Sequence, residues 1–207
     1  VVSPSTINSY VENGNAVIAP GGLIILSAQV ANRMLSGVVE NTGSLQANAM
    51  VNDGGRILLR STDKINNSGS IQANASLNNT GKGGNITLIA DLDNPSSQTI
   101  VSGSISAKGG GLGGDGGFIE TSASNLNIQS GANISATAPL GDAGVWLLDP
   151  VNITIQGSGT TVPIGGGTVM PADSSSTVDV ATLNAALTAG NSVTITTTAG
   201  GLGSQEG

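Results

Sequence analysis

The sequence predicts an all-β protein, a parallel β-helix with three short strands in each coil and one short helix near the C-terminus. Three observations support this prediction. A two-part phrase occurs five times in the first 150 residues, its apolar residues alternate with other residues, and the 207-residue chain contains 32 Gly but only 1% aromatic residues. We expect a single continuous β-helix segment of a longer chain over 1–207, with five regular repeats in 1–150 and irregular coils in 151–207.

The first half of the phrase is a small polar residue and a Gly, followed by a short alternating strand. Its copies read NGNAVIA, TGSLQA, SGSIQA, SGSISA and SGANISA. Because side chains two residues apart lie on the same face of a strand, one large apolar column and one alanine column should face the core. These columns are Val17, Leu45, Ile71, Ile105 and Ile134, and then Ala19, Ala47, Ala73, Ala107 and Ala136.

The second half of the phrase is a pair of small residues, usually Gly-Gly, that opens a longer strand. Its copies read GGLIILSA, GGRILLRS, GGNITLIA, GGFIETSA and AGVWLLDP. The expected inward positions are Ile24, Ile57, Ile86, Ile119 and Trp146, followed by Leu26, Leu59, Leu88, Thr121 and Leu148. We therefore expect Trp146, the only Trp in the chain, to fill the core rather than to stack on a sugar.

A third strand, with a less regular pattern, is expected before the small polar residue and Gly of each copy. It contains Val38-Val39, Ile65, Ile100-Val101 and Leu126–Ile128. The copies recur about every 26 to 34 residues, a period shorter than the roughly 40 residues of a propeller blade. Three strands per coil fit this spacing. We also expect the residues before the turn Gly to stack in a ladder of small polar groups: Asn13, Thr42, Ser68, Ser102 and Ser130.

The pattern changes after residue 150. NITIQ at 152–156 predicts one more strand, and a Gly/Thr/Pro/Ser-rich loop is expected over 157–177. A short helix is expected at about 179–189, with Asp179 capping its start and Gly190 ending it. Its buried face should carry Leu183, Ala186 and Leu187, and the alternating residues after it predict a further coil. We expect both ends of the sequence to lack a capping segment over the exposed coil, as in a piece cut from a longer rod.

The composition narrows the possible functions. A net charge of −7 with only 6 Lys+Arg, together with 1% aromatic residues, argues against nucleic-acid binding, which needs a basic surface and stacking platforms. No apolar run approaches the roughly 20 residues of a membrane helix, and no secretory leader opens the chain. Disorder is the competing interpretation of a chain rich in Gly, Ser and Asn. The hydrophobic residues, 38% of the chain, argue against it because they recur at the same positions of each repeat.

Three segments carry a family resemblance: GGFIETSA at 116–123, WLLDPVNITI at 146–155 and STVDVATLNAALTAGNSVTITTTAG at 176–200. With the repeats, they resemble large exoproteins of the two-partner secretion class, the filamentous-haemagglutinin and high-molecular-weight adhesin types. The resemblance implies a right-handed β-helical rod that an outer-membrane barrel transporter secretes, and that is displayed on the surface of a Gram-negative bacterium or released. The NPNG-like secretion motif of that class is missing, so an internal or C-terminal-side segment is expected.

No residue is assigned a catalytic, cofactor-binding or metal-binding role. The chain has no His, and the acidic residues are expected to be spread out without forming a column between coils: Asp53, Asp91, Asp93, Asp115, Glu120, Asp142 and Asp149. GGLGGD at 110–115 matches the start of a calcium-binding nonapeptide, but a single copy cannot surround an ion. GKGGN at 81–85 lacks the spacing of a phosphate-binding loop.

These observations favour an adhesin rod that attaches to cells, host tissue or a biofilm matrix. Its contacts would lie along flat sheet faces and at loop insertions such as 91–99 and 108–115. The receptor is unknown, with a glycan or exopolysaccharide as one possibility. One alternative is a self-assembling extracellular filament subunit, and a further one is a carbohydrate-active β-helix enzyme, which an acidic cluster between coils would favour.

Overall fold

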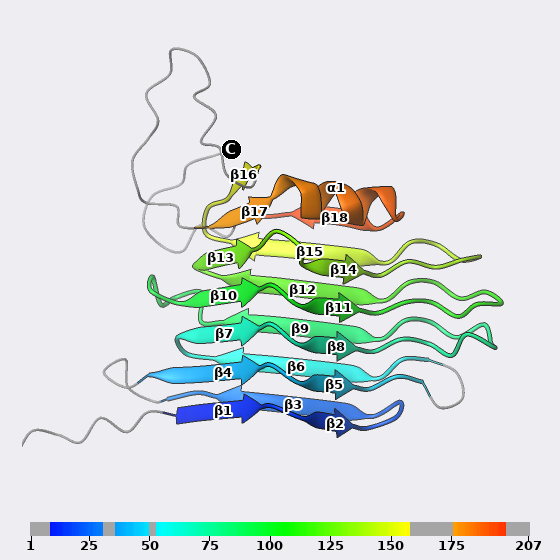
Figure 1. The fold of residues 1–207 in the computed structure, drawn as a ribbon, viewed down its shortest axis with the longest axis horizontal. Helices are drawn as coiled ribbons and strands as arrows, with labels where there is room; N and C mark the ends of the chain where they lie inside the picture. Colours follow the sequence, from blue (N-terminus) through cyan, green and yellow to red (C-terminus); the bar gives the residue numbers. More distant parts are fainter. Residues whose placement is uncertain (1–8, 31–35, 50–52, 158–175, 198–207) are drawn as a thin grey trace, which may run out of the picture.

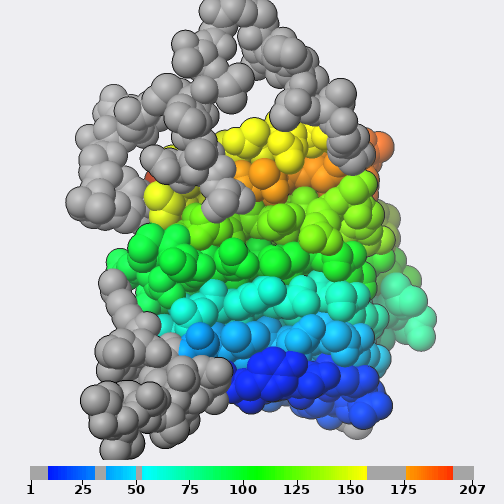
Figure 2. All heavy atoms as spheres, turned by 60° about the vertical axis from the view of Figure 1, so that its left-hand side comes forward, coloured from blue at the N-terminus to red at the C-terminus, as the bar shows by residue number. Residues whose placement is uncertain are grey.

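The computed structural model describes residues 9–30, 36–49, 53–157 and 176–197, which form a parallel β-solenoid of about five coils (Figure 1). Figure 2 shows the coils as successive layers, from the blue first coil upward. Each coil contributes one strand to each of three parallel sheets. This arrangement confirms the predicted fold class.

Within each sheet, every strand stacks on the one from a neighbouring coil in a fixed order along the rod. The first sheet contains β1 (Ser9–Asn13), β4 (Gly37–Asn41), β7 (Lys64–Asn67), β10 (Gln98–Val101), β13 (Asn125–Ile128), β17 (Thr177–Asp179) and β16 (Thr154–Gln156). The second contains β2 (Ala16–Ile18), β5 (Ser44–Gln46), β8 (Ser70–Gln72), β11 (Ser104–Ser106) and β14 (Asn133–Ser135). The third contains β3 (Leu23–Ala28), β6 (Arg56–Ser61), β9 (Asn85–Ala90), β12 (Phe118–Ala123), β15 (Val145–Pro150) and β18 (Ser192–Ile195).

The two predicted apolar columns are confirmed residue by residue. Ile71 pairs with Leu45 below and Ile105 above, and Ile86 pairs with Ile57 and Ile119. From the second coil upward these side chains are almost fully buried, whereas Val17 in the first coil is 39% exposed because no described coil lies beneath it. The core is a narrow column of Ile, Leu, Val and Ala.

The Gly pairs are required by the close approach of successive coils. A Cβ on Gly84 would lie 2.0 Å from the carbonyl oxygen of Gly55, and one on Gly117 would lie 2.1 Å from that of Gly84. Real Cβ atoms do not approach a backbone oxygen so closely, so only Gly fits where these turns stack.

Trp146 fills the core as predicted, and it explains why Thr121 interrupts a column of leucines. Trp146 pairs in register with Ile119, and its indole Nε1 donates a hydrogen bond of 3.2 Å to Thr121 Oγ1. Both residues are fully buried. The hydroxyl satisfies a donor that a leucine at this position would leave unpaired.

The predicted ladder of small polar residues is wrong at its two ends. In the first turn the Gly lies one position earlier than in the next three turns, and the last turn is two residues longer. Asn13 therefore pairs with Asn41 rather than with Thr42, and the residue that stacks on Ser102 is Gln129 rather than Ser130. The pairing of residues between coils is therefore set by the strands and not by the position of the turn Gly.

An asparagine ladder, which the sequence analysis missed, lies inside the first sheet. Asn13 Nδ2 donates to Asn41 Oδ1 at 2.7 Å, and Asn41 Nδ2 donates to Asn67 Oδ1 at 2.7 Å. All three residues are buried. Val101 occupies the next position, so the Nδ2 group of Asn67 has no hydrogen-bond partner in the described part of the chain.

The short helix is confirmed as α1 (Val180–Thr188), with Asp179 at its N-cap and Gly190 in the left-handed region at a φ of 93°. Its buried residues are Thr182, Leu183 and Ala186. The expectation for Leu187 is wrong, because this residue is 48% exposed. The predicted loop 157–177 lies mostly outside the described residues, and its last position, Thr177, already belongs to β17.

The helix covers the last strand of the second sheet, in the position that a further strand would occupy (Figure 1). Asn191, which follows the helix, holds it there: Oδ1 accepts a hydrogen bond from the N–H of Ala136, and Nδ2 donates to Ala186 O at 2.6 Å. The helix therefore caps the upper edge of the second sheet. A covered edge cannot pair with another strand.

Candidate binding surfaces

Three stacked loops form one side of the rod, here called the loop edge: residues 73–84, 107–117 and 136–144 (Figure 1). Backbone hydrogen bonds join each loop to the next. Ala75 N donates to Lys108 O at 2.8 Å, Leu112 N donates to Asn79 O at 3.0 Å, and Gly109 N donates to Thr137 O at 2.9 Å. The predicted insertion 108–115 thus stacks on the loop below it instead of standing free.

Each loop of the loop edge presents one leucine to solvent. Leu77 is 74% exposed, Leu112 is 63% exposed and Leu140 is 73% exposed. The backbones of the first two lie in adjacent layers, because a Cβ on Gly111 would lie 2.2 Å from Leu77 O. Single exposed leucines are common, but a leucine at the tip of three successive loops forms an apolar row.

A column of charged residues runs along the base of the loop edge, at the position before each pair of small residues. It contains Asp53, Lys82, Asp115 and Asp142. Lys82 Nζ lies 2.7 Å from Asp115 Oδ2, its backbone N–H donates to Asp53 Oδ1 at 2.7 Å, and Asp142 N donates to Asp115 Oδ1 at 3.2 Å. The column therefore links four coils through alternating side-chain and backbone contacts.

The charges in this column shift two pKa values. The hydrogen bond from Lys82, together with the one from the Asp142 backbone, lowers the pKa of Asp115 below its ordinary 3.8, and the same ion pair raises the pKa of Lys82 above 10.5. Both carboxylate oxygens of Asp115 are thus engaged. Among the residues that the structure describes, no cluster of three or more potential metal ligands of the His, Cys, Asp or Glu type is found.

The other predicted contact loop, 91–99, is tied closely to the rod. Its last two residues belong to β10, and the remainder is anchored by Asn94, whose Nδ2 donates to Thr62 O at 2.9 Å and to Asp63 Oδ1 at 3.1 Å. Ser97 Oγ accepts from Ser124 N at 3.1 Å. These bonds join the loop to the coil on either side of it, which favours a structural role.

A pair of stacked carboxylates that the sequence pattern had not singled out lies on the first sheet. Glu12 and Glu40 pair in register on the outer face of β1 and β4. Tyr10 Oη donates to Glu40 Oε2 at 2.8 Å and to Glu12 Oε2 at 3.3 Å, and Asn66 Nδ2 donates to Glu40 Oε1 at 3.1 Å. The hydrogen bond to Glu40, reinforced by both negative charges, raises the pKa of Tyr10 to about 12.

Comparison with protein-family models, with curated proteins and with solved structures finds no significant match. Within the described ranges, no helix has the length and apolar character needed to span a membrane.

Proposed function

We propose that the chain is part of a secreted or surface-displayed adhesin rod of a Gram-negative bacterium, exported by an outer-membrane barrel transporter. The sequence segments that resemble two-partner secretion exoproteins support the secretion route, and the β-solenoid is the fold that this resemblance implies. A solenoid also suits this task physically, because each coil packs only on its neighbours and the rod can lengthen without a new core.

The observation that carries the adhesive role is the apolar row of Leu77, Leu112 and Leu140 on the loop edge. Burying one such side chain contributes roughly 1.5–3 kcal/mol, so three leucines on one rigid support can bind a partner surface together when each alone would be too weak. The backbone bonds between the loops hold the row in place before binding, which reduces the entropy lost on contact.

Attachment of coated beads tests this role. Beads that carry the chain should adhere to epithelial cells or to biofilm matrix, and the variant L77S/L112S/L140S should reduce the number attached by about ten-fold or more. The matched control is I18S/L23S/I25S, which removes three exposed apolar side chains from the first coil. Equal attachment of the wild type and the loop-edge variant would contradict the proposed role of the row.

The filament alternative depends on stacking of one copy on another. The edges of β3 and β18 in the third sheet are open to a further strand among the described residues, which favours it. Helix α1 and Asn191 occupy the corresponding place above β14, which argues against it. Sedimentation over a hundred-fold range of concentration distinguishes the two, because a filament subunit lengthens with concentration and an adhesin rod does not.

The Glu12 and Glu40 pair is the observation that favours the enzyme alternative, since glycoside hydrolysis uses two carboxylates. Adjacent parallel strands place such residues about 4.8 Å apart, close to the spacing of retaining glycosidases. If the pair were catalytic, the chain would release reducing sugar from a polysaccharide and E40Q would abolish the release. Reducing-sugar assays on a polysaccharide panel provide this test.

A further inference from the structure

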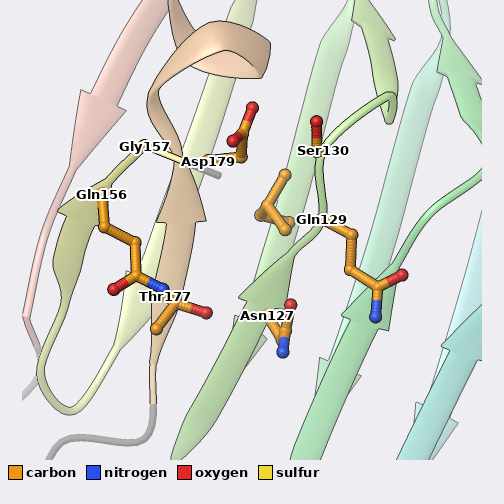
Figure 3. A pocket seen from close by; sticks show the side chains of 8 residues that line it. Asn127, Gln129, Ser130, Gln156, Gly157, Thr177 and Asp179 are labelled. Carbon is orange, nitrogen blue, oxygen red and sulfur yellow. The ribbon is translucent and has the colours of Figure 1, made fainter. Parts of the chain in front are cut away.

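A polar pocket lies on the outer face of the first sheet, where the regular stacking of coils ends (Figure 3). Strand β17 inserts between β13 and β16, although β16 precedes it in the chain. This crossover brings together segments about 50 residues apart. The resulting pocket has a volume of about 300 Å³, and its polar lining consists of Asn127, Gln129, Ser130, Gln156, Thr177 and Asp179.

Asp179 is the unusual member of this lining because it is only 6% exposed and half of its carboxylate is unused. Oδ1 caps the helix by accepting from Thr182 N at 2.9 Å and from Thr182 Oγ1 at 3.2 Å. Oδ2 is buried and has no hydrogen-bond partner among the described residues. An unpaired buried carboxylate oxygen is costly, so a small movement that lets a donor reach it from the pocket would be favourable.

The remaining polar side chains around the pocket are also uncommitted. The side chains of Asn127, Gln129, Ser130 and Gln156 make no hydrogen bond to any other residue that the structure describes. Asn and Gln amides each offer both a donor and an acceptor, and a hydroxyl does the same. One coil below, Ile100 stands where Asn127 stands, so the amide cluster is confined to this end of the sheet.

We propose that this pocket binds one neutral sugar ring of a glycan, with a ring hydroxyl donating to the Asp179 carboxylate. A hydroxyl donor gives a charge-assisted hydrogen bond, and the amides can pair with the neighbouring hydroxyls in both directions. An anionic ligand does not fit, because the described part of the lining contains the Asp179 carboxyl group and no Lys or Arg. The volume is at the lower end of ligand pockets, about 300–1,000 Å³, which suits one ring.

This inference rests on the proposed adhesive function for the source of the glycan, and it goes beyond that function in naming the site. A divalent cation is the competing occupant, but Asp179 is the only carboxylate among the described lining residues and calcium takes about 6–8 oxygen ligands. Binding of Ca²⁺ alone would identify the cation as the occupant.

The test is ligand-observed NMR with the methyl glycosides of glucose, galactose, mannose and N-acetylglucosamine. We expect saturation transfer to at least one of them. The variant D179N should weaken that binding about ten-fold or more, because it keeps the capping oxygen and replaces the Oδ2 acceptor with an N–H donor. Q156A should weaken binding as well, and the matched control Q98A, an exposed amide one coil below β13, should not.

Three results would overturn the proposal: no glycoside binds, D179N binds like the wild type, or Ca²⁺ alone binds by calorimetry in a manner that D179N abolishes. Circular dichroism of D179N checks that α1 remains folded. The bead assay separates the two proposals. If D179N loses glycoside binding but its beads still attach, the apolar row remains the adhesive surface. If the wild type binds a glycoside but its beads do not attach, only the proposed adhesive function is contradicted.

Discussion

The first three coils and the C-terminal end of the rod meet the same packing requirement in different ways. In the first three coils, one residue type repeats, and Asn13, Asn41 and Asn67 pass a hydrogen bond from coil to coil. At the C-terminal end two side-chain contacts have no counterpart in the coils below: Trp146 on Thr121, and Asn191 on Ala136 and Ala186. A repeated contact can be interrupted and still leave part of the ladder, whereas a single contact has no substitute.

The largest effect should come from a charge in the repeated core. Ile86→Asp places a carboxylate in a fully buried apolar column, and we expect it to lower the free energy of unfolding by more than about 4 kcal/mol. Asn78→Asp, on an exposed loop position, is the control and should change it by less than about 0.5 kcal/mol. Urea unfolding followed by Trp146 fluorescence measures both. Similar midpoints for the two variants would show that the inward register is wrong.

The next effect concerns the single contact at the C-terminal end. Asn191→Ala leaves the N–H of Ala136 without its partner, whereas the carbonyl of Ala186 still accepts from the backbone N–H of residue 191. The free energy of unfolding should therefore fall by about 1–3 kcal/mol. Amide hydrogen exchange should show the loss mainly in β14 and α1, with β5 and β8 unchanged. Uniform faster exchange along the rod would mean that the end is not a separate cap.

The asparagine ladder should respond according to position. Asn41→Val leaves Asn67 Oδ1 unpaired and removes the shortest hydrogen bond of Asn13 Nδ2, which keeps longer bonds of 3.3 Å to Asn15 O and Ser44 O. Asn67→Val leaves only Asn41 Nδ2 unpaired and removes an amide whose own Nδ2 already lacks a partner. We therefore expect Asn41→Val to be more destabilising than Asn67→Val by about 1–2 kcal/mol. Chemical unfolding of the two variants decides this, and the opposite order would contradict the ladder.

The smallest effect lies on the outer face of the same coils. Tyr10 is the only Tyr, so phenolate absorbance reports its pKa directly, and we expect a midpoint of about 12 in place of 10.0. Because the folded pKa is the higher one, its stabilising contribution is present below pH 10 and is lost as the pH rises toward 12. Glu40→Gln should move the midpoint down toward 10.0. An unchanged midpoint would rule out Glu40 as the main cause.

Local patterns in the sequence predict most of the fold. The two phrases fix which residues of the second and third sheets face inward, and Asp179 and Gly190 mark the ends of α1. These succeed because a period of two and a helix cap are properties of neighbouring residues. The repeated Gly pairs succeed for the same reason.

The missed features fall into two groups. The first sheet carries the pattern Val11-Glu12-Asn13, Val39-Glu40-Asn41 and Ile65-Asn66-Asn67, which accounts for both the buried asparagine ladder and the outer carboxylate pair. Alignment on the turn Gly hid it, because Gly14 follows Asn13 directly whereas Thr42 separates Asn41 from Gly43. The pocket around Asp179 depends on insertion of β17 between two earlier strands, and no local pattern encodes a crossover of that length.

Stacking of coils in the stated register is the claim on which both proposals depend, and cysteine cross-linking tests it most directly because the chain has no Cys. Gln72 and Ser106 pair on the outer face of the second sheet, while Ser104 pairs with Ser70. We predict that Q72C/S106C forms an intramolecular disulfide on mild oxidation. Q72C/S104C should not, because its Cα atoms would lie about 8 Å apart. A disulfide in the second variant and none in the first would contradict the register of the rod.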